Sequence, residues 1–186
     1  MAVFKMGTKT VLSQTGSDNP TWGANAPTNA IIQVVQTAVT SQVTVSENTT
    51  FGDAISRSIT TVAASSKIMV IPTVYFGLKY DEGYQGVARI VRDKPSADTL
   101  VDNSVSIKDS VIGHYHLSDS GSTRWQQAMS LQLLDAPAQN AGTTITYKIQ
   151  ACLSAGNGGE AIYLNRWALN TDVKGVSTLT LYEIAG

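Results

Sequence analysis

The stretch that decides the fold runs from Val176 to Ile184 and reads VSTLTLYEI. Successive side chains of a β-strand point to opposite faces, so a strand over these residues would divide them into two sets. One set holds Ser177, Leu179, Leu181 and Glu183, and the other holds Val176, Thr178, Thr180 and Tyr182. This alternation predicts a strand with one face toward a core.

Similar short stretches, separated by turn residues, continue back along the chain to about residue 30. The predicted strands are Ile31–Thr40, Gln42–Ser46, Ala54–Val62, Lys67–Tyr80, Gly86–Val91, Val111–Leu117, Ala128–Leu134, Thr143–Leu153, Ala161–Asn165 and Val176–Ile184. Helix signals are weak, and only Trp125–Met129 could form a helical turn instead of a strand. The spacing predicts an all-β fold, a jelly-roll-like β-sandwich over residues 30–186.

Residues 1–29 differ from the rest because turn-forming Gly, Asn, Asp and Pro alternate with apolar side chains. A disordered tail seldom carries so many apolar residues. We therefore predict an extended N-terminal arm that anchors the chain to a partner. Its expected anchoring residues are Val3, Phe4, Val11, Leu12 and Trp22.

Composition narrows the classes of function. Of the 186 residues only 15% are charged, 42% are hydrophobic, and the formal net charge is −1. With no basic cluster, we expect no nucleic-acid partner. A Thr-rich, weakly charged surface suits burial against neighbouring subunits, where charges would be costly to desolvate.

Targeting and redox signals are few. The N-terminus lacks the apolar segment of a secretory signal, and the longest apolar run, near Ile68 to Ile71, is too short to span a membrane. Cys152 is the single cysteine and lies in an apolar stretch, so we expect a buried hydrophobic side chain. The chain is expected to be made in the cytoplasm, without membrane insertion.

Motifs of catalysis are missing from the sequence. It contains no Gly-x-Ser-x-Gly, His-Glu-x-x-His or phosphate-binding glycine loop, so we expect no enzyme, no catalytic or metal-binding residues and no cofactor. Two alternatives stay open at this point. His114 and His116 would share one face of a strand and could bind a metal or meet across a symmetry axis. Asp81 and Glu82 could bind a cation, although solvated turn carboxylates are the simpler interpretation.

Aromatic residues near turns are the better functional lead. Tyr80 and Tyr84 flank the turn at residues 81–83, Tyr115 lies between the two histidines, and Trp125 follows a Ser-rich loop. Such residues commonly contact carbohydrate or protein. The candidate ligand or interface contacts are Tyr80, Tyr84, His114, Tyr115, His116 and Trp125. Packing across strands is the competing interpretation.

Several segments resemble bacteriophage virion proteins. The final strand within GVSTLTLYEI (175–184), together with AIYLNR (161–166), is similar to the ending of many such proteins, with Tyr182 in place of the usual Met. VLSQTGSDNPTW (11–22) resembles the motif before knob domains of phage tail fibres, and SSKIMV (65–70) and LDAP (134–137) resemble a strand and a turn of the same family.

This resemblance implies a homotrimeric, jelly-roll-like virion protein that contacts other virion proteins through its arm. The favoured function is a short tail fibre or receptor-binding knob that binds a glycan or protein of the host surface. The alternative is a capsid decoration protein, of the cement or head-fibre type. A further alternative is a free-standing carbohydrate-binding β-sandwich module.

Overall fold

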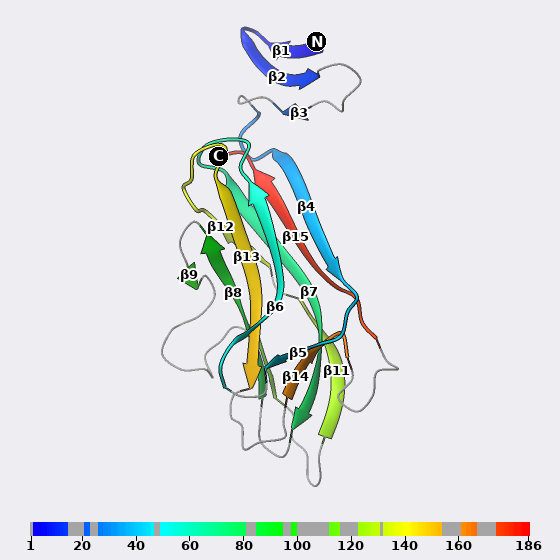
Figure 1. Ribbon diagram of the computed structural model, residues 1–186. Coiled ribbons are helices and arrows are strands. Elements are labelled where there is room, and N and C mark those ends of the chain that lie inside the picture. The colour runs from blue at the N-terminus through cyan, green and yellow to red at the C-terminus, as the bar shows by residue number, and fades with distance from the viewer. Residues whose placement is uncertain are drawn as a thin grey trace.

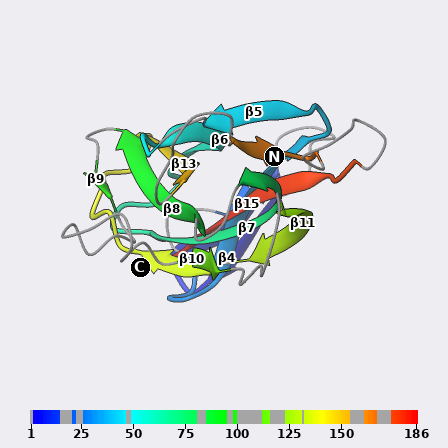
Figure 2. The same cartoon turned by 90° about the horizontal axis from the view of Figure 1, so that it is seen from below.

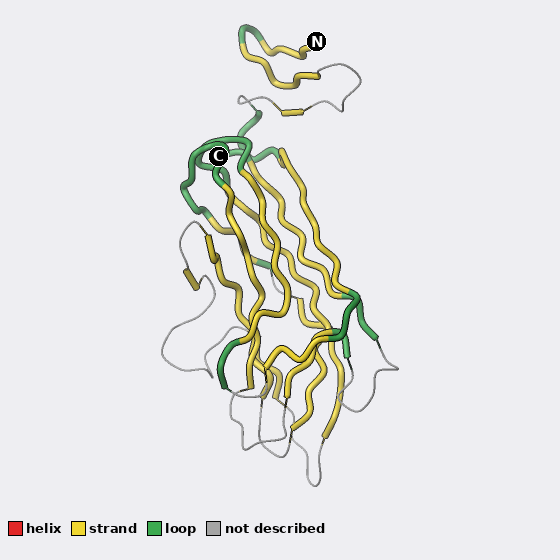
Figure 3. Tube along the Cα trace, viewed as in Figure 1, coloured by secondary structure: helices red, strands yellow, loops and turns green. Residues whose placement is uncertain are grey.

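The computed structural model describes residues 2–14, 21–22, 26–46, 49–80, 85–94, 98–99, 112–115, 123–130, 132–153, 161–166 and 174–186 (Figures 1 and 3). Within these ranges the regular structure consists of strands, and no helix is present. A helix that could cross a membrane is accordingly not found among them. The all-β prediction is confirmed.

The described strands form three antiparallel sheets, and the largest has seven strands in the order β4-β15-β7-β14-β5, with β11 and β12 also paired to β7. Its strands are β4 (Ile31–Val39), β5 (Val43–Ser46), β7 (Lys67–Tyr80), β11 (Thr123–Ser130), β12 (Leu133–Asp135), β14 (Ala161–Leu164) and β15 (Ser177–Ile184). β7 is long enough to pair with β15 and then β14 along one edge, and with β12 and then β11 along the other.

The second sheet has five strands in the order β10-β8-β13-β6, and the short β9 also pairs with β8. Its strands are β6 (Gly52–Thr60), β8 (Gln85–Lys94), β9 (Asp98–Thr99), β10 (Ile112–Tyr115) and β13 (Thr144–Leu153). The two large sheets lie face to face, as Figure 2 shows from the end of the molecule.

The core lies between these two sheets. β13 sends Ile145, Tyr147 and Ile149 inward, and β7 sends Val74 and Phe76 toward them, all with at most 2% of their surface exposed. A fully buried side chain of this size contributes about 1.5–3 kcal/mol relative to an exposed one. The alternation read from the sequence is therefore what makes the sandwich, and the β-sandwich prediction is confirmed.

The boundaries of most strands agree with the sequence prediction. β7 begins and ends at the predicted residues, and β15 buries the predicted set that contains Leu179 and Leu181. One prediction is wrong: Ala128–Leu134 is not a single strand, because β11 ends at Ser130 and β12 begins at Leu133. The structure also resolves the helix-or-strand alternative at Trp125–Met129, which belongs to β11.

The third sheet is formed by the N-terminal residues, in the order β1-β2-β3. Its strands are β1 (Ala2–Met6), β2 (Lys9–Gln14) and β3 (Thr21–Trp22). A tight turn at Gly7, whose φ of 64° suits glycine, reverses the chain between β1 and β2. The arm thus folds back on itself and does not run as one extended segment. Figure 1 shows this sheet beyond the end of the sandwich that carries the C-terminus.

Candidate functional site

Four of the six predicted aromatic and histidine contacts lie in described strands that meet at the end of the sandwich opposite the N-terminal sheet (Figure 1): Tyr80, His114, Tyr115 and Trp125. β7 ends at Tyr80, which pairs with Thr123 at the start of β11. His114 and Tyr115 end β10 and pair with Gly86 and Gln85 at the start of β8. Backbone pairing therefore gathers segments that are far apart in the sequence at one end of the molecule.

The structure describes the backbone of some candidate residues and leaves others outside the described ranges. Tyr80, His114, Tyr115 and Trp125 have described backbone positions in β7, β10 and β11, whereas their side chains are outside what the structure describes. Tyr84 and His116 lie outside the described residues, and so do Asp81 and Glu82. No group of three His, Cys, Asp or Glu side chains that could hold a metal occurs in the described part of the chain.

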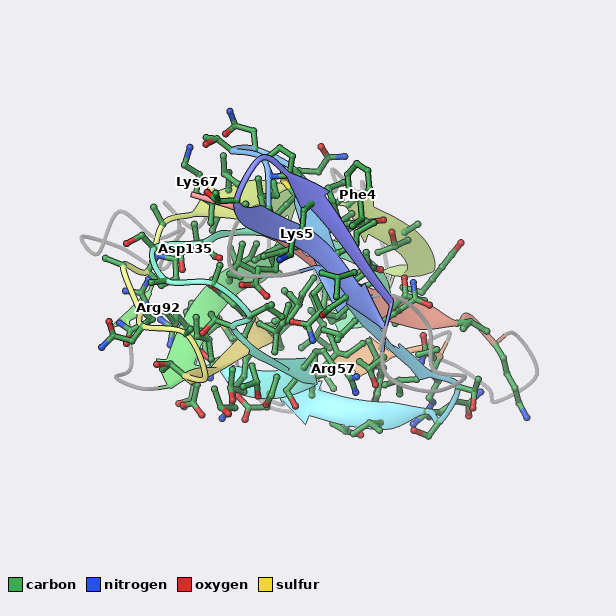
Figure 4. The ribbon with its side chains drawn as sticks, turned by 90° about the horizontal axis from the view of Figure 1, so that it is seen from above. Phe4, Lys5, Arg57, Lys67, Arg92 and Asp135 are labelled. Carbon is green, nitrogen blue, oxygen red and sulfur yellow. The ribbon has the colours of Figure 1, made fainter. Side chains whose placement is uncertain are left out.

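The N-terminal sheet presents two of the predicted anchoring residues to solvent. Val3 is 39% exposed and Phe4 is 56% exposed, and Phe4 pairs with the half-buried Leu12 across the hairpin. Figure 4 shows Phe4 on this hairpin, viewed along the molecule from the N-terminal end. Val11 and Trp22 lie in β2 and β3, with side chains outside the described set.

The outer face of the five-stranded sheet is polar and charged. Lys148 on β13 forms ion pairs with Asp53 on β6 at 3.0 Å and with Asp93 on β8 at 3.3 Å. Hydrogen bonds to these carboxylates raise the pKa of Lys148. Burial alone would raise the pKa of Asp53, but hydrogen bonds from Gln150 and Lys148 outweigh it and lower that pKa. This face has the chemistry of a surface that stays in contact with water.

The outer face of the seven-stranded sheet has a different character. Strand register aligns Val34, Tyr182, Met69 and Leu134 in one row across β4, β15, β7 and β12. Neighbouring rows on the same face hold Gln36, Thr180 and Ile71, then Ala38, Thr178, Thr73 and Ser130, then Tyr75 and Ala128. We call these thirteen residues the uncharged face, because none carries a charge.

A buried carboxylate fixes the C-terminal strand. Glu183 is fully buried on the inward side of β15, and its Oε1 accepts hydrogen bonds from the Val62 and Ala63 N–H groups at 2.8 and 3.1 Å. The Ser66 hydroxyl donates to the same oxygen at 2.7 Å. The Val62 N–H also lies 2.9 Å from Oε2. The carboxylate therefore binds the turn between β6 and β7 and is occupied by the protein itself.

A second buried group joins the two sheets. Asp135 at the end of β12 accepts hydrogen bonds from the Arg92 guanidinium on β8, with 2.9 and 2.8 Å to its two oxygens. The Tyr147 hydroxyl on β13 donates to Asp135 Oδ2 at 2.7 Å. Burial and the hydrogen bond to Asp135 raise the pKa of Tyr147, which stays protonated. Arg92 and Asp135 are labelled side by side at one edge of the sandwich in Figure 4.

Asn165 fixes the ends of three strands where β14 stops. Its side chain is fully buried and donates to the carbonyl oxygens of Val39 and Ser41 at 2.7 and 3.1 Å. Its Oδ1 accepts from the Ser177 hydroxyl at 2.6 Å, and Ser177 in turn accepts from the Tyr75 N–H. The polar groups that look most like site residues by their burial thus have structural partners.

Cys152 is fully buried in β13, as predicted. Burial raises the pKa of its thiol to about 11, so the reactive thiolate is rare at neutral pH.

Sequence reasoning missed the uncharged face and the buried Glu183. Thr178, Thr180 and Tyr182 had been assigned to one side of their strand, but the partners on neighbouring strands depend on register. A signal for Glu183 was present, because it shares the inward set with Leu179 and Leu181. A carboxylate at such a position must find hydrogen-bond donors inside the protein.

The comparisons with known proteins are sparse. No protein-family model and no curated protein matches the sequence. Among solved structures, a chain in a structure of infectious bursal disease virus, Gt strain, is similar with a TM-score of 0.30 and 14% sequence identity. The similarity covers 100% of this chain and 42% of that chain. A match at this level carries no inference about function.

Proposed function

We propose that this chain is a non-enzymatic structural protein of a phage virion, a short trimeric tail fibre or receptor-binding knob. In this proposal the N-terminal sheet attaches the chain to other virion proteins. The opposite end of the sandwich faces the host surface, where it binds a glycan or a protein.

The observation that carries the proposal is the difference between the two ends of the molecule. The N-terminal sheet lies beyond one end of the sandwich and exposes Val3 and Phe4 (Figure 1). Tyr80, Tyr115 and Trp125 lie at or near strand ends that meet at the other end. An attachment protein needs such an arrangement, because it must hold the particle and the receptor at the same time.

A structural role is supported by how the buried polar groups are used. Glu183, Asp135 and Asn165 are each saturated by donors or acceptors within the protein. A general base or nucleophile must lie within hydrogen-bond reach of a reacting group. The hydrogen-bonding atoms of these three side chains are instead bonded to groups within the protein. The pKa of Cys152 is raised to about 11, so little of the thiolate that a cysteine nucleophile requires is present at neutral pH.

The proposal is tested by immunogold electron microscopy of purified virus particles from the organism that encodes the chain, with an antibody against residues 30–186. Labelling at the tail supports the proposal. Labelling on the head would replace it with capsid decoration, and absence from particles would overturn a virion role. Binding of the purified chain to host envelope glycans tests the receptor part separately, with no binding to host envelope material as the contrary result.

A second experiment tests the anchor. We expect a variant that lacks residues 2–25 to remain folded and assembled while failing to enter particles. The double substitution Val3→Asp with Phe4→Asp should have the same effect, because two exposed apolar contacts become charged. Thr8→Asp is the matched control, since Thr8 is exposed in the hairpin turn between the same strands. Normal incorporation of the double variant would contradict the anchor role.

A further inference from the structure

Arg57 on β6 carries a buried polar group that has no partner. The side chain is half-buried, and its Nε–H group is out of contact with solvent and has no hydrogen-bond acceptor. The other such group in the described part of the chain is Nε of Arg166, whose Cζ lies 4.3 Å from the centre of the Tyr163 ring. For Arg57 the described residues offer neither an ion pair nor an aromatic ring. Buried donors in proteins are nearly always paired, so this exception requires an explanation.

Strand register places Arg57 at one end of a row that crosses the inner face of the five-stranded sheet. Arg57 pairs with Tyr147 on β13, and Tyr147 pairs on its other side with Arg92 on β8. Directly paired residues of antiparallel strands point to the same face, and Tyr147 is buried in the core, so both arginines point inward. Arg92 meets Asp135 on β12, whereas Arg57 meets no carboxylate of the described chain and lies well away from that pair in Figure 4. The row thus has an acidic strand at one end, and the described residues supply none at the other.

The free side of β6 is open where Arg57 lies. β6 and its neighbour β4 are each the last described strand of their sheets. At Gly52, the start of β6, the Val45 carbonyl lies so close that a Cβ atom would not fit. At its other end, the Thr60 carbonyl oxygen accepts a hydrogen bond of 3.0 Å from the side-chain amide of Gln33 on β4. Between these contacts, residues 54–58 have no described strand on their free side, and such an edge can pair with a strand of another chain.

The charges along this edge indicate the chemistry of the partner. β4 and β5 contain no charged residue, and β6 contains Asp53 and Arg57. Lys148 already pairs with Asp53 at 3.0 Å, which leaves the Arg57 guanidinium as the uncompensated charge. A guanidinium binds a carboxylate through two parallel hydrogen bonds and suits buried ion pairs better than an ammonium group does. One cation in a chain of net charge −1 gives no basic field for nucleic acid, so a carboxylate on a peptide is the matching ligand.

We propose that residues 54–58 of β6 dock an extended acidic segment of a partner chain, whose carboxylate pairs with Arg57. A strand added to β6 places every second side chain on the inward face, where it lies beside Arg57. The partner would supply at this edge what β12 supplies at the opposite one, a short strand that ends in an aspartate. Backbone pairing holds the segment, and the ion pair selects an acidic one. The site goes beyond the proposed function, because it binds along the side of the sandwich and not at either end.

The test adds two synthetic peptides to the isotope-labelled full chain and follows its backbone N–H resonances by NMR. The acidic peptide has the sequence LQLLDAP of residues 131–137, which contains β12, and the neutral peptide has Asn at the position of Asp135. We expect the acidic peptide to shift the resonances of residues 54–58 saturably and to bind about 10-fold more tightly than the neutral one, the size expected for one charged hydrogen bond. Arg57→Gln should remove this preference. Lys148→Gln is the matched control, because it removes one positive charge from the outer face of the same sheet and should leave the preference unchanged.

A second measurement separates docking from a role in the fold. Arg57→Met keeps an unbranched apolar side chain and removes the unpaired Nε–H group, so the midpoint of urea denaturation should stay the same or rise. A lower midpoint would assign Arg57 to the fold and contradict the proposal. Equal binding of the two peptides by the wild type, no binding of the acidic peptide, or inorganic phosphate bound at Arg57 as tightly as that peptide would also overturn it. Absence of the chain from virus particles would instead remove the virion role and leave this site intact.

Discussion

Glu183 shows at the scale of one residue how a polar group can hold a core together. Glu183→Gln keeps one side-chain oxygen as an acceptor but replaces the other with an NH2 donor, so the N–H groups of Val62 and Ala63 and the Ser66 hydroxyl lose hydrogen bonds to a charged group, and such bonds are worth about 1.5–3 kcal/mol each. We predict that Glu183→Gln lowers the free energy of unfolding by about 3 kcal/mol in urea denaturation. Asp53→Asn removes a half-exposed carboxylate and should cost less than about 1 kcal/mol. Equal stability of Glu183→Gln and wild type would refute this role.

Cys152 gives a residue-scale prediction about pH. Its pKa rises from 9.0 to about 11 on folding, so the folded chain holds the thiol proton more tightly than the unfolded chain. The stability from this group is complete below pH 9 and is lost as the pH rises toward 11. We predict that Cys152→Ala loses less stability than the wild type between pH 9 and pH 11, as measured by urea denaturation across that window. Parallel curves for the two proteins would contradict the assignment.

At the scale of elements, the Arg92–Asp135–Tyr147 group joins β8, β12 and β13. Removing one member of a buried ion pair leaves an uncompensated charge, which costs about 3–5 kcal/mol. We predict a loss of about 3 kcal/mol for Arg92→Gln, and partial recovery when Asp135→Asn is added. Lys148→Gln, which breaks the more exposed ion pairs of the five-stranded sheet, should cost about 1 kcal/mol or less. A double variant less stable than Arg92→Gln would show that the pair is not coupled.

The elements also show what a sequence can and cannot specify. β7 was predicted with both its ends, and the turn residues Asp81-Glu82-Gly83 mark its end in the sequence. β11 and β12 were merged because the run from Ala128 to Leu134 has no Gly, Pro, Asn or Asp, and their separation appears only when both pair with β7. The strands of the N-terminal sheet were missed for a related reason, since they are stabilised by pairing with each other. Alternation predicts which residues face inward, but register decides which outward residues become neighbours.

On the scale of the whole molecule, the protein has two different ends and two different outer faces. The N-terminal sheet and the gathered strand ends define an axis, and the uncharged face runs along the side of the sandwich. In the proposed trimer, several N-terminal sheets would attach to the particle together, and the attachment would be multivalent. Linked contacts of this kind strengthen attachment without requiring a stronger single contact.

Cryo-electron microscopy of the intact virus particle tests the central claim most directly. The account predicts three copies of the chain at the tail, with their N-terminal sheets toward the particle and Tyr80, Tyr115 and Trp125 at the outward end. Particles that lack the chain, or that carry it with the N-terminal sheet pointing outward, would contradict the account.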